Sequence, residues 1–115
     1  MRNYEQSKML RLLFTEGEKF GGKPLYEAIV EKCRELSIAG ATVFRGIEGF
    51  GHTGEIHHSH LMAHDLPILV TIVDSPENLG RLLPVIEQMM DRGTIATSDV
   101  MSIRIRKKTV AAQNV

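Results

Sequence analysis

The side chains most able to perform chemistry are concentrated in one stretch of this chain, residues 45–67. All five histidines of the protein lie there, between positions 52 and 64. The same stretch contains four glycines, Gly46, Gly49, Gly51 and Gly54, which give the backbone a freedom that other residues lack. Connections in small domains usually take about 2 to 6 residues, and longer ones tend to be functional or disordered. Function is therefore expected first in this stretch.

Metal binding is one chemistry that the histidines could perform. Four of them are dense enough for a transition-metal site, namely His57, His58, His60 and His64. Two of these, His60 and His64, would share a face if that part of the chain were helical. Their spacing matches no recognised metal motif, so a solvated polar loop is the alternative interpretation. Catalysis by Ser59 with a histidine lacks support, because no nucleophile elbow or oxyanion feature accompanies it.

Composition narrows the class of protein. The chain has 115 residues, with 14 acidic and 14 basic side chains, which suits one small domain supplemented by self-association. Balanced charge does not favour a nucleic-acid or membrane surface. No apolar run approaches the roughly 20 residues of a membrane span, and the single Cys33 cannot form an internal disulfide. We therefore expect a cytoplasmic protein without membrane insertion, with Cys33 as a core side chain.

The elements that must position the histidine-rich stretch alternate between strands and helices. Strands are predicted at 8–14, 41–48, 68–73 and within 94–106, and helices at 24–37 and 76–92, the second with Pro84 as a kink. This order is the ferredoxin-like βαββαβ arrangement, an α+β fold with a four-stranded antiparallel sheet and two helices on one face. Residues 1–7 are expected to be a flexible N-terminus and 107–115 a tail. Residues 8–106 form the domain, with a long loop at about 50–66.

One predicted strand is apolar on both faces. Residues 68–73 read ILVTIV, a pattern that requires cover on both sides of the sheet. Both helices are expected on one face of the sheet. The opposite face must then carry one of the two alternating sets of side chains on this strand, the set that contains Leu69 or the set that contains Ile68. An exposed apolar face of that kind normally indicates an interface. A homo-oligomer is the predicted result.

The sequence also resembles a known family. Residues 40–51 read GATVFRGIEGFG and resemble PII nitrogen-regulatory signal proteins, in which a G-x-T-V segment leads into a G-F-G turn and a long loop. Residues 103–106, IRIR, are similar to the end of PII. Over residues 10–106 the chain resembles an uncharacterised PII-like branch classed as a domain of unknown function. The resemblance implies a homotrimer in which the inner sheet faces meet and nucleotides bind in clefts between subunits, at the base of the loop.

Site residues follow from the same resemblance. The matched positions are Thr42 near the adenine, Gly49, Phe50 and Gly51 in the G-F-G turn along the phosphates, and Arg104 and Arg106 as phosphate contacts. Two arginines on one strand face could form paired, charge-assisted hydrogen bonds to phosphate. Without the resemblance, these arginines could equally be solvated and the glycines could serve only a tight turn.

Two departures from PII bear on the ligand. The PII phosphate loop, T-G-x-x-G-D-G-K, is replaced here by DRGTIATSD at residues 91–99, which favours a nucleotide with fewer phosphates. No tyrosine occurs between Gly51 and Pro67, so the tyrosine modification of some PII proteins has no acceptor.

The resulting hypothesis is a regulatory binding protein and not an enzyme. It would bind an adenine nucleotide, AMP, ADP or ATP, and signal through the long loop to a protein target such as a transporter or an enzyme. The alternative hypothesis is a metal-binding or metal-responsive trimer that uses the histidine-rich loop.

Overall fold

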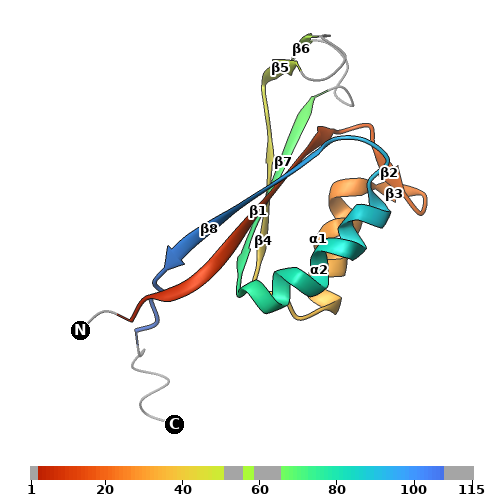
Figure 1. The fold of residues 1–115 in the computed structure, drawn as a ribbon. Helices are drawn as coiled ribbons and strands as arrows, with labels where there is room; N and C mark the ends of the chain where they lie inside the picture. The colour runs from red at the N-terminus through yellow and green to blue at the C-terminus, as the bar shows by residue number, and fades with distance from the viewer. Residues whose placement is uncertain (1–2, 51–55, 59–65, 108–115) are drawn as a thin grey trace.

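A four-stranded antiparallel sheet with two helices on one face forms the body of the protein (Figure 1). The computed structural model describes residues 3–50, 56–58 and 66–107. In spatial order, the strands are β4 (Ala41–Arg45), β7 (Pro67–Asp74), β1 (Glu5–Thr15) and β8 (Thr94–Ser102). The helices are α1 (Leu25–Glu35) and α2 (Pro76–Met89). This is the predicted ferredoxin-like α+β arrangement, which the structure confirms.

Alternation along the two central strands separates a packed face from an uncovered one. The register places Leu10 opposite Ile72 and Leu12 opposite Val70. These side chains and their neighbours form the core beneath the helices: Leu10, Leu12, Phe14, Ile68, Val70 and Ile72. Because successive side chains of a strand point to opposite faces, Leu69 lies on the uncovered face. The uncovered apolar series is therefore that of Leu69 and not that of Ile68.

Helix α1 covers part of this core with one apolar stripe. Its buried side chains are Leu25, Ala28, Ile29 and Cys33. The helix begins at Leu25, with Pro24 as its N-cap, one residue later than predicted. Cys33 is only 2% exposed, and this burial raises its pKa to about 11. The thiol is thus a protonated core side chain, as expected from the sequence.

Helix α2 begins with a capped first turn. The Ser75 hydroxyl accepts a hydrogen bond from the Asn78 amide at 3.1 Å, and Pro76 occupies the first turn, where its missing N–H costs nothing. Pro84 lies inside the helix, as predicted, but the helix ends at Met89 and not next to Gly93. In the described part of the chain, neither helix is long and apolar enough to cross a membrane.

Gly93 serves the turn from α2 into β8. Its φ is +126°, in a region that side chains rarely adopt. A Cβ at this position would collide with the Leu13 carbonyl oxygen of β1. The close approach of the β1 backbone therefore explains why a glycine occupies position 93.

Two short hairpins add to the predicted elements. β2 (Lys19–Phe20) pairs with β3 (Lys23–Pro24), and β5 (Glu48–Phe50) pairs with β6 (Ile56–His58). The second hairpin extends from the end of the sheet formed by β4 and β7 (Figure 1). It falls partly in the range 50–66, where only a loop was expected. Arms of two or three residues are too short to show a hydrophobic period, so the sequence did not reveal them.

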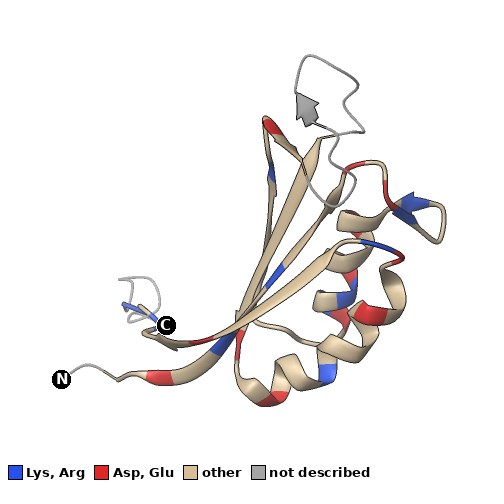
Figure 2. Cartoon of the chain, turned by 45° about the horizontal axis from the view of Figure 1, so that its top comes forward, with Lys and Arg blue, Asp and Glu red and all other residues tan. Residues whose placement is uncertain are grey.

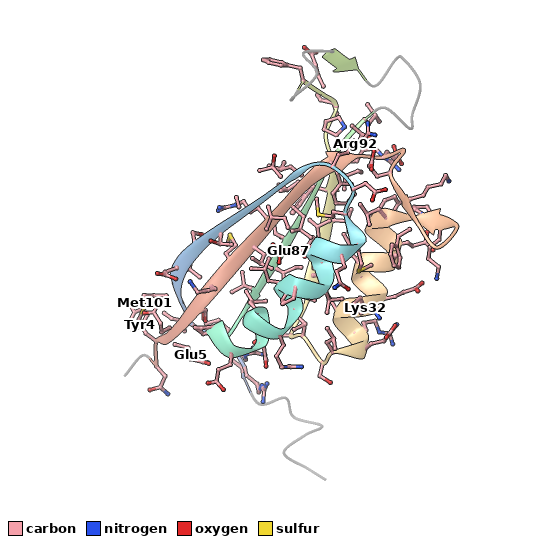
Figure 3. The ribbon with its side chains drawn as sticks, turned by 45° about the vertical axis from the view of Figure 1, so that its right-hand side comes forward. Tyr4, Glu5, Lys32, Glu87, Arg92 and Met101 are labelled. Carbon is pink, nitrogen blue, oxygen red and sulfur yellow. The ribbon has the colours of Figure 1, made fainter. Side chains whose placement is uncertain are left out.

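The outer ends of β1 and β8 continue past the helices as a two-stranded ribbon. Tyr4, Glu5 and Met101 lie at its far end, away from the helices (Figure 3). The ribbon is linked by the hydroxyl oxygens of Ser7 and Ser102, which are 2.8 Å apart. β1 starts at Glu5, earlier than the predicted position 8, and β8 ends at Ser102, earlier than predicted.

Asp74, at the end of β7, joins three parts of the fold. Its Oδ2 accepts a hydrogen bond from the Ala39 amide at 2.9 Å. Its Oδ1 accepts from the Ser75 amide at 2.6 Å and from Asn78 Nδ2 at 3.1 Å. Partial burial raises the pKa of Asp74, but these hydrogen bonds and the charge of Arg104 outweigh burial, so the net pKa lies below 3.8.

Replacing Asp74 by Asn should destabilise the fold at neutral pH, because an amide nitrogen would face hydrogen-bond donors. The loss should be about 1 kcal/mol, since solvent screens this partly exposed site. The lowered pKa means that the carboxylate stabilises the native state above the unfolded pKa. This contribution is lost as pH falls through the folded pKa. Urea unfolding at neutral and acidic pH measures it, with exposed Asp91→Asn as the control. A difference between Asp74→Asn and wild type that persisted unchanged in acid would contradict this assignment.

Candidate functional site

Three of the residues predicted to bind a nucleotide lie near opposite ends of β7: Gly49 and Phe50 near its start, and Arg104 near its end. Gly49 belongs to the β5–β6 hairpin and packs near Pro67, the first residue of β7. The charge of Arg104 lowers the pKa of Asp74, the last residue of the same strand. β7 has eight residues, so its ends are roughly 23 Å apart. One phosphate group cannot contact both groups within a single subunit.

The two arginines are placed differently from the prediction. Arg104 and Arg106 are exposed and follow β8 in irregular structure, so they do not alternate on one strand face. The reason is the length of the neighbouring strand. Ser102 pairs with Glu5, the first residue of β1, so β1 offers no hydrogen-bonding partner beyond it.

Thr42 lies in the middle of β4, on the uncovered face of the sheet. It is exposed and sits opposite Thr71 of β7. The next β4 residue on that face, Phe44, sits opposite Leu69. Thr42 is therefore placed where a neighbouring subunit could approach it, and away from the hairpin.

The predicted loop residues are only partly described. Gly51, His60 and His64 lie outside the described residues. His57 and His58 belong to β6, where they pair with Gly49 and Glu48 through the backbone. Within the residues that the structure describes, no three His, Cys, Asp or Glu side chains are grouped so as to hold a metal ion.

Two glycines at the base of the hairpin pack against Pro67. A Cβ on Gly46 would lie 2.6 Å from Pro67 Cγ, and a Cβ on Gly49 would lie 3.3 Å from the same atom. The Gly46 amide also donates to the Pro67 carbonyl oxygen at 2.7 Å. Both glycines thus have a packing reason, which for Gly49 adds to the predicted contact with phosphate.

A polar cluster that the sequence did not reveal lies at the same base. The guanidinium Nη2 of Arg45 donates to the Oε2 atom of Glu16, a residue 29 positions away in the chain. This hydrogen bond and the charge of Glu16 raise the pKa of Arg45, with a smaller contribution from Tyr26. The Glu16 amide donates to the Leu66 carbonyl oxygen at 2.8 Å. No local pattern could have indicated a contact between such distant positions.

A cavity of about 270 Å³ lies at the turn from α2 to β8, at the chain position of the PII phosphate loop. It is lined by Glu87, Met90, Asp91, Arg92, Gly93 and Ile95. Figure 3 shows Glu87 on α2 and Arg92 near the turn into β8. The lining contains two carboxylates and one guanidinium, and Arg92 Nε lies 3.7 Å from Glu18 Oε2. This charge balance is unfavourable for a polyphosphate chain.

Charged side chains are distributed unevenly over the molecule. Figure 2 shows acidic and basic residues interspersed on the helices, while the strands of the sheet carry few. The described part of the chain therefore presents a mixed helical surface and a largely uncharged sheet.

Comparison with solved structures finds the same fold in PII-like proteins. CPII, a nitrogen regulatory PII-like protein from Thiomonas intermedia K12, was solved bound to ADP, AMP and bicarbonate. It matches with a TM-score of 0.66 and 21% identity over 90% of this chain and 94% of that chain. A putative PII-like signaling protein from Thermus thermophilus matches with a TM-score of 0.61 and 15% identity, over 88% and 92% of the two chains. At these identities the likeness shows the fold.

The family follows from the sequence. Residues 7–102 match the model of the DUF190 family, described as "Uncharacterized ACR, COG1993", and the chain belongs to this family. A UPF0166 protein of Aquifex aeolicus strain VF5 is 39% identical over 97 residues, which cover 83% of this chain and 91% of that protein. The expected membership of an uncharacterised PII-like branch is thus confirmed.

The packing at Pro67 predicts different costs for two similar substitutions. Gly46→Ala should lower the free energy of unfolding by about 1 to 3 kcal/mol, because its methyl group would overlap the proline ring. Gly49→Ala should cost less, since its contact needs a shift of only a few tenths of an ångström. Urea denaturation of both variants measures the difference. Equal losses, or a larger loss for Gly49→Ala, would contradict this view of the hairpin base.

Proposed function

We propose that this protein is a trimeric PII-like regulator that binds an adenine nucleotide between neighbouring subunits and reports its occupancy to a protein partner. The main support is the separation of the two predicted groups of site residues. The hairpin backbone lies at one end of β7 and the arginines at the other. Residues from two subunits can form one site where residues from one subunit cannot.

The uncovered sheet face supports the assembly. Phe44, Leu69 and Leu13 form a continuous row across β4, β7 and β1. In the isolated chain Phe44 is 51% exposed and Leu13 is 43% exposed. A row of large apolar side chains on a sheet normally packs against a partner. Other copies of the same chain are the proposed partner, because the resemblance to PII proteins implies a trimer in which the inner sheet faces meet.

A binding role fits the described residues better than catalysis. The single thiol, Cys33, is buried and protonated at neutral pH. The polar cluster at the hairpin base, Glu16 with Arg45, is an ion pair without a nucleophile. CPII, whose fold this chain shares, was solved bound to ADP and AMP. An adenine nucleotide is therefore the proposed ligand.

The turn from α2 to β8 favours a nucleotide with few phosphates. Glu87 and Asp91 line the cavity there, and Arg92 faces Glu18. Two carboxylates near a polyphosphate chain would repel it. AMP or ADP is proposed in preference to ATP.

Assembly is tested by placing a charge in the apolar row. Leu69→Asp should dissociate the trimer, because burying an unpaired carboxylate at each interface costs several kcal/mol. Phe44→Asp, at a more exposed position of the monomer, should do the same with less risk to folding. Light scattering coupled to gel filtration measures the mass, and circular dichroism checks the fold. Gln88→Asp, on the exposed side of α2, is the control and should remain a trimer.

A wild-type protein that is monomeric at about micromolar concentration would contradict the assembly. It would also remove the proposed site, since the hairpin and the arginines could not meet.

Nucleotide binding is tested by calorimetry with AMP, ADP and ATP. Arg104→Ala or Arg106→Ala should weaken binding by about 1.5 to 3 kcal/mol, the usual worth of a hydrogen bond to a charged group, which is roughly a 10- to 150-fold change in Kd. Arg34→Ala, an exposed arginine of α1, should leave affinity unchanged. The absence of binding of all three nucleotides to wild type would overturn the proposal. Mass spectrometry of ligands released from the native protein separates a nucleotide from a metal ion.

A further inference from the structure

Glu16 contacts both feet of the β5–β6 hairpin. One foot is Arg45 with Gly46, where the chain leaves β4, and the other is Leu66 with Pro67, where it enters β7. The Glu16 amide donates to the Leu66 carbonyl oxygen at 2.8 Å, and its carboxylate accepts from Arg45. The two feet are joined directly by the Gly46 amide, which donates to the Pro67 carbonyl oxygen at 2.7 Å. These bonds form a closed ring across the base of the hairpin.

The two partners of the ion pair differ in their exposure. The side chain of Glu16 is 13% exposed, whereas that of Arg45 is 54% exposed. Glu16 Oε1 is buried and has no hydrogen-bond partner among the described residues. Among the described residues, Arg45 is the cationic partner of this carboxylate, and losing it would leave a largely buried charge without that compensation. The carboxylate therefore holds Arg45, and with it the first foot, in place.

A neighbouring glutamate provides a natural comparison. Glu18 has a side-chain exposure of 19% and lies near Arg92, with 3.7 Å between Oε2 and Nε. Its carbonyl oxygen accepts from the Leu25 amide at 2.8 Å. These contacts connect it to α1 and to the turn before β8. The two glutamates are similar in burial and lie two residues apart, but they contact different parts of the fold.

We propose that Glu16 is a positioning residue that joins the two feet of the β5–β6 hairpin, and that its ion pair with Arg45 sets how firmly the hairpin is held against the sheet. The hairpin carries Gly49 and Phe50. If the proposed function holds, Glu16 then controls nucleotide affinity without touching the nucleotide. The ring itself does not depend on any ligand.

Hydrogen exchange in the absence of ligand is the direct test. Glu16→Gln removes the charge, keeps the shape and keeps the backbone bond to Leu66. Amides of residues 48–50 and 56–58 should exchange about tenfold faster in this variant, which corresponds to about 1.4 kcal/mol. Glu18→Gln should leave them unchanged. Amides of the β1–β7 pair should keep their protection in both variants, which separates a local effect from general loss of stability.

A second pair of variants distinguishes an ion pair from simple packing. Arg45→Gln leaves the buried Glu16 carboxylate unpaired and should accelerate exchange more than Glu16→Gln does. Adding Glu16→Gln to Arg45→Gln removes that charge, so the double variant should exchange more slowly than Arg45→Gln alone. Such partial rescue is not expected if the two side chains act only by filling space.

The proposal is overturned if Glu16→Gln matches wild type, if Glu18→Gln accelerates exchange equally, or if the double variant shows no rescue. Calorimetry with ADP tests the functional consequence separately. Glu16→Gln should change the Kd for ADP several-fold, while Arg104→Ala should change the Kd without altering exchange in the hairpin. If the wild-type protein does not bind ADP, the proposed function is refuted, whereas the exchange result still stands.

Discussion

The antiparallel pairing of β1 with β7 is the constraint on which the rest of the structure depends. Leu12 and Val70 lie opposite each other across this pair with no exposed area. Alternation along each strand then determines which face of the sheet each remaining side chain occupies. The helices cover one face because their apolar stripes need that core. The opposite face receives no cover from the described chain, and the proposed assembly follows from that asymmetry.

β7 also links the two ends of the proposed site. At one end, Asp74 accepts hydrogen bonds from the Ala39 amide and from the Ser75 amide at the start of α2, and the charge of Arg104 lowers its pKa. At the other end Pro67 supports the base of the hairpin, with Gly46 packed on its ring. A central strand paired on both sides is among the most rigid elements of such a domain. In the proposed trimer, this strand would hold the hairpin of one site and the arginines of the next at a constant separation.

The sequence by itself determined the two helices, the four strands of the main sheet and their order along the chain. Leu10, Leu12 and Phe14 showed a period of two, and the apolar stripes of both helices showed a helical period, because each signal arises within a few neighbouring residues. The start of α2 at Ser75 and Pro76 could be predicted for the same reason. The family resemblance added the PII-like fold, which the solved structures share.

Only the tertiary structure decided what surrounds the candidate site. The end of β8 at Ser102 depends on where its partner β1 begins, so the strand placement of Arg104 could not be judged from its own alternating pattern. The ion pair of Glu16 with Arg45 joins residues 29 positions apart, and the tight packing of Gly46 appears only when Pro67 is beside it. Local periodicity is encoded in adjacent residues, whereas strand pairing, close approach and distant ion pairs exist only after the chain has folded.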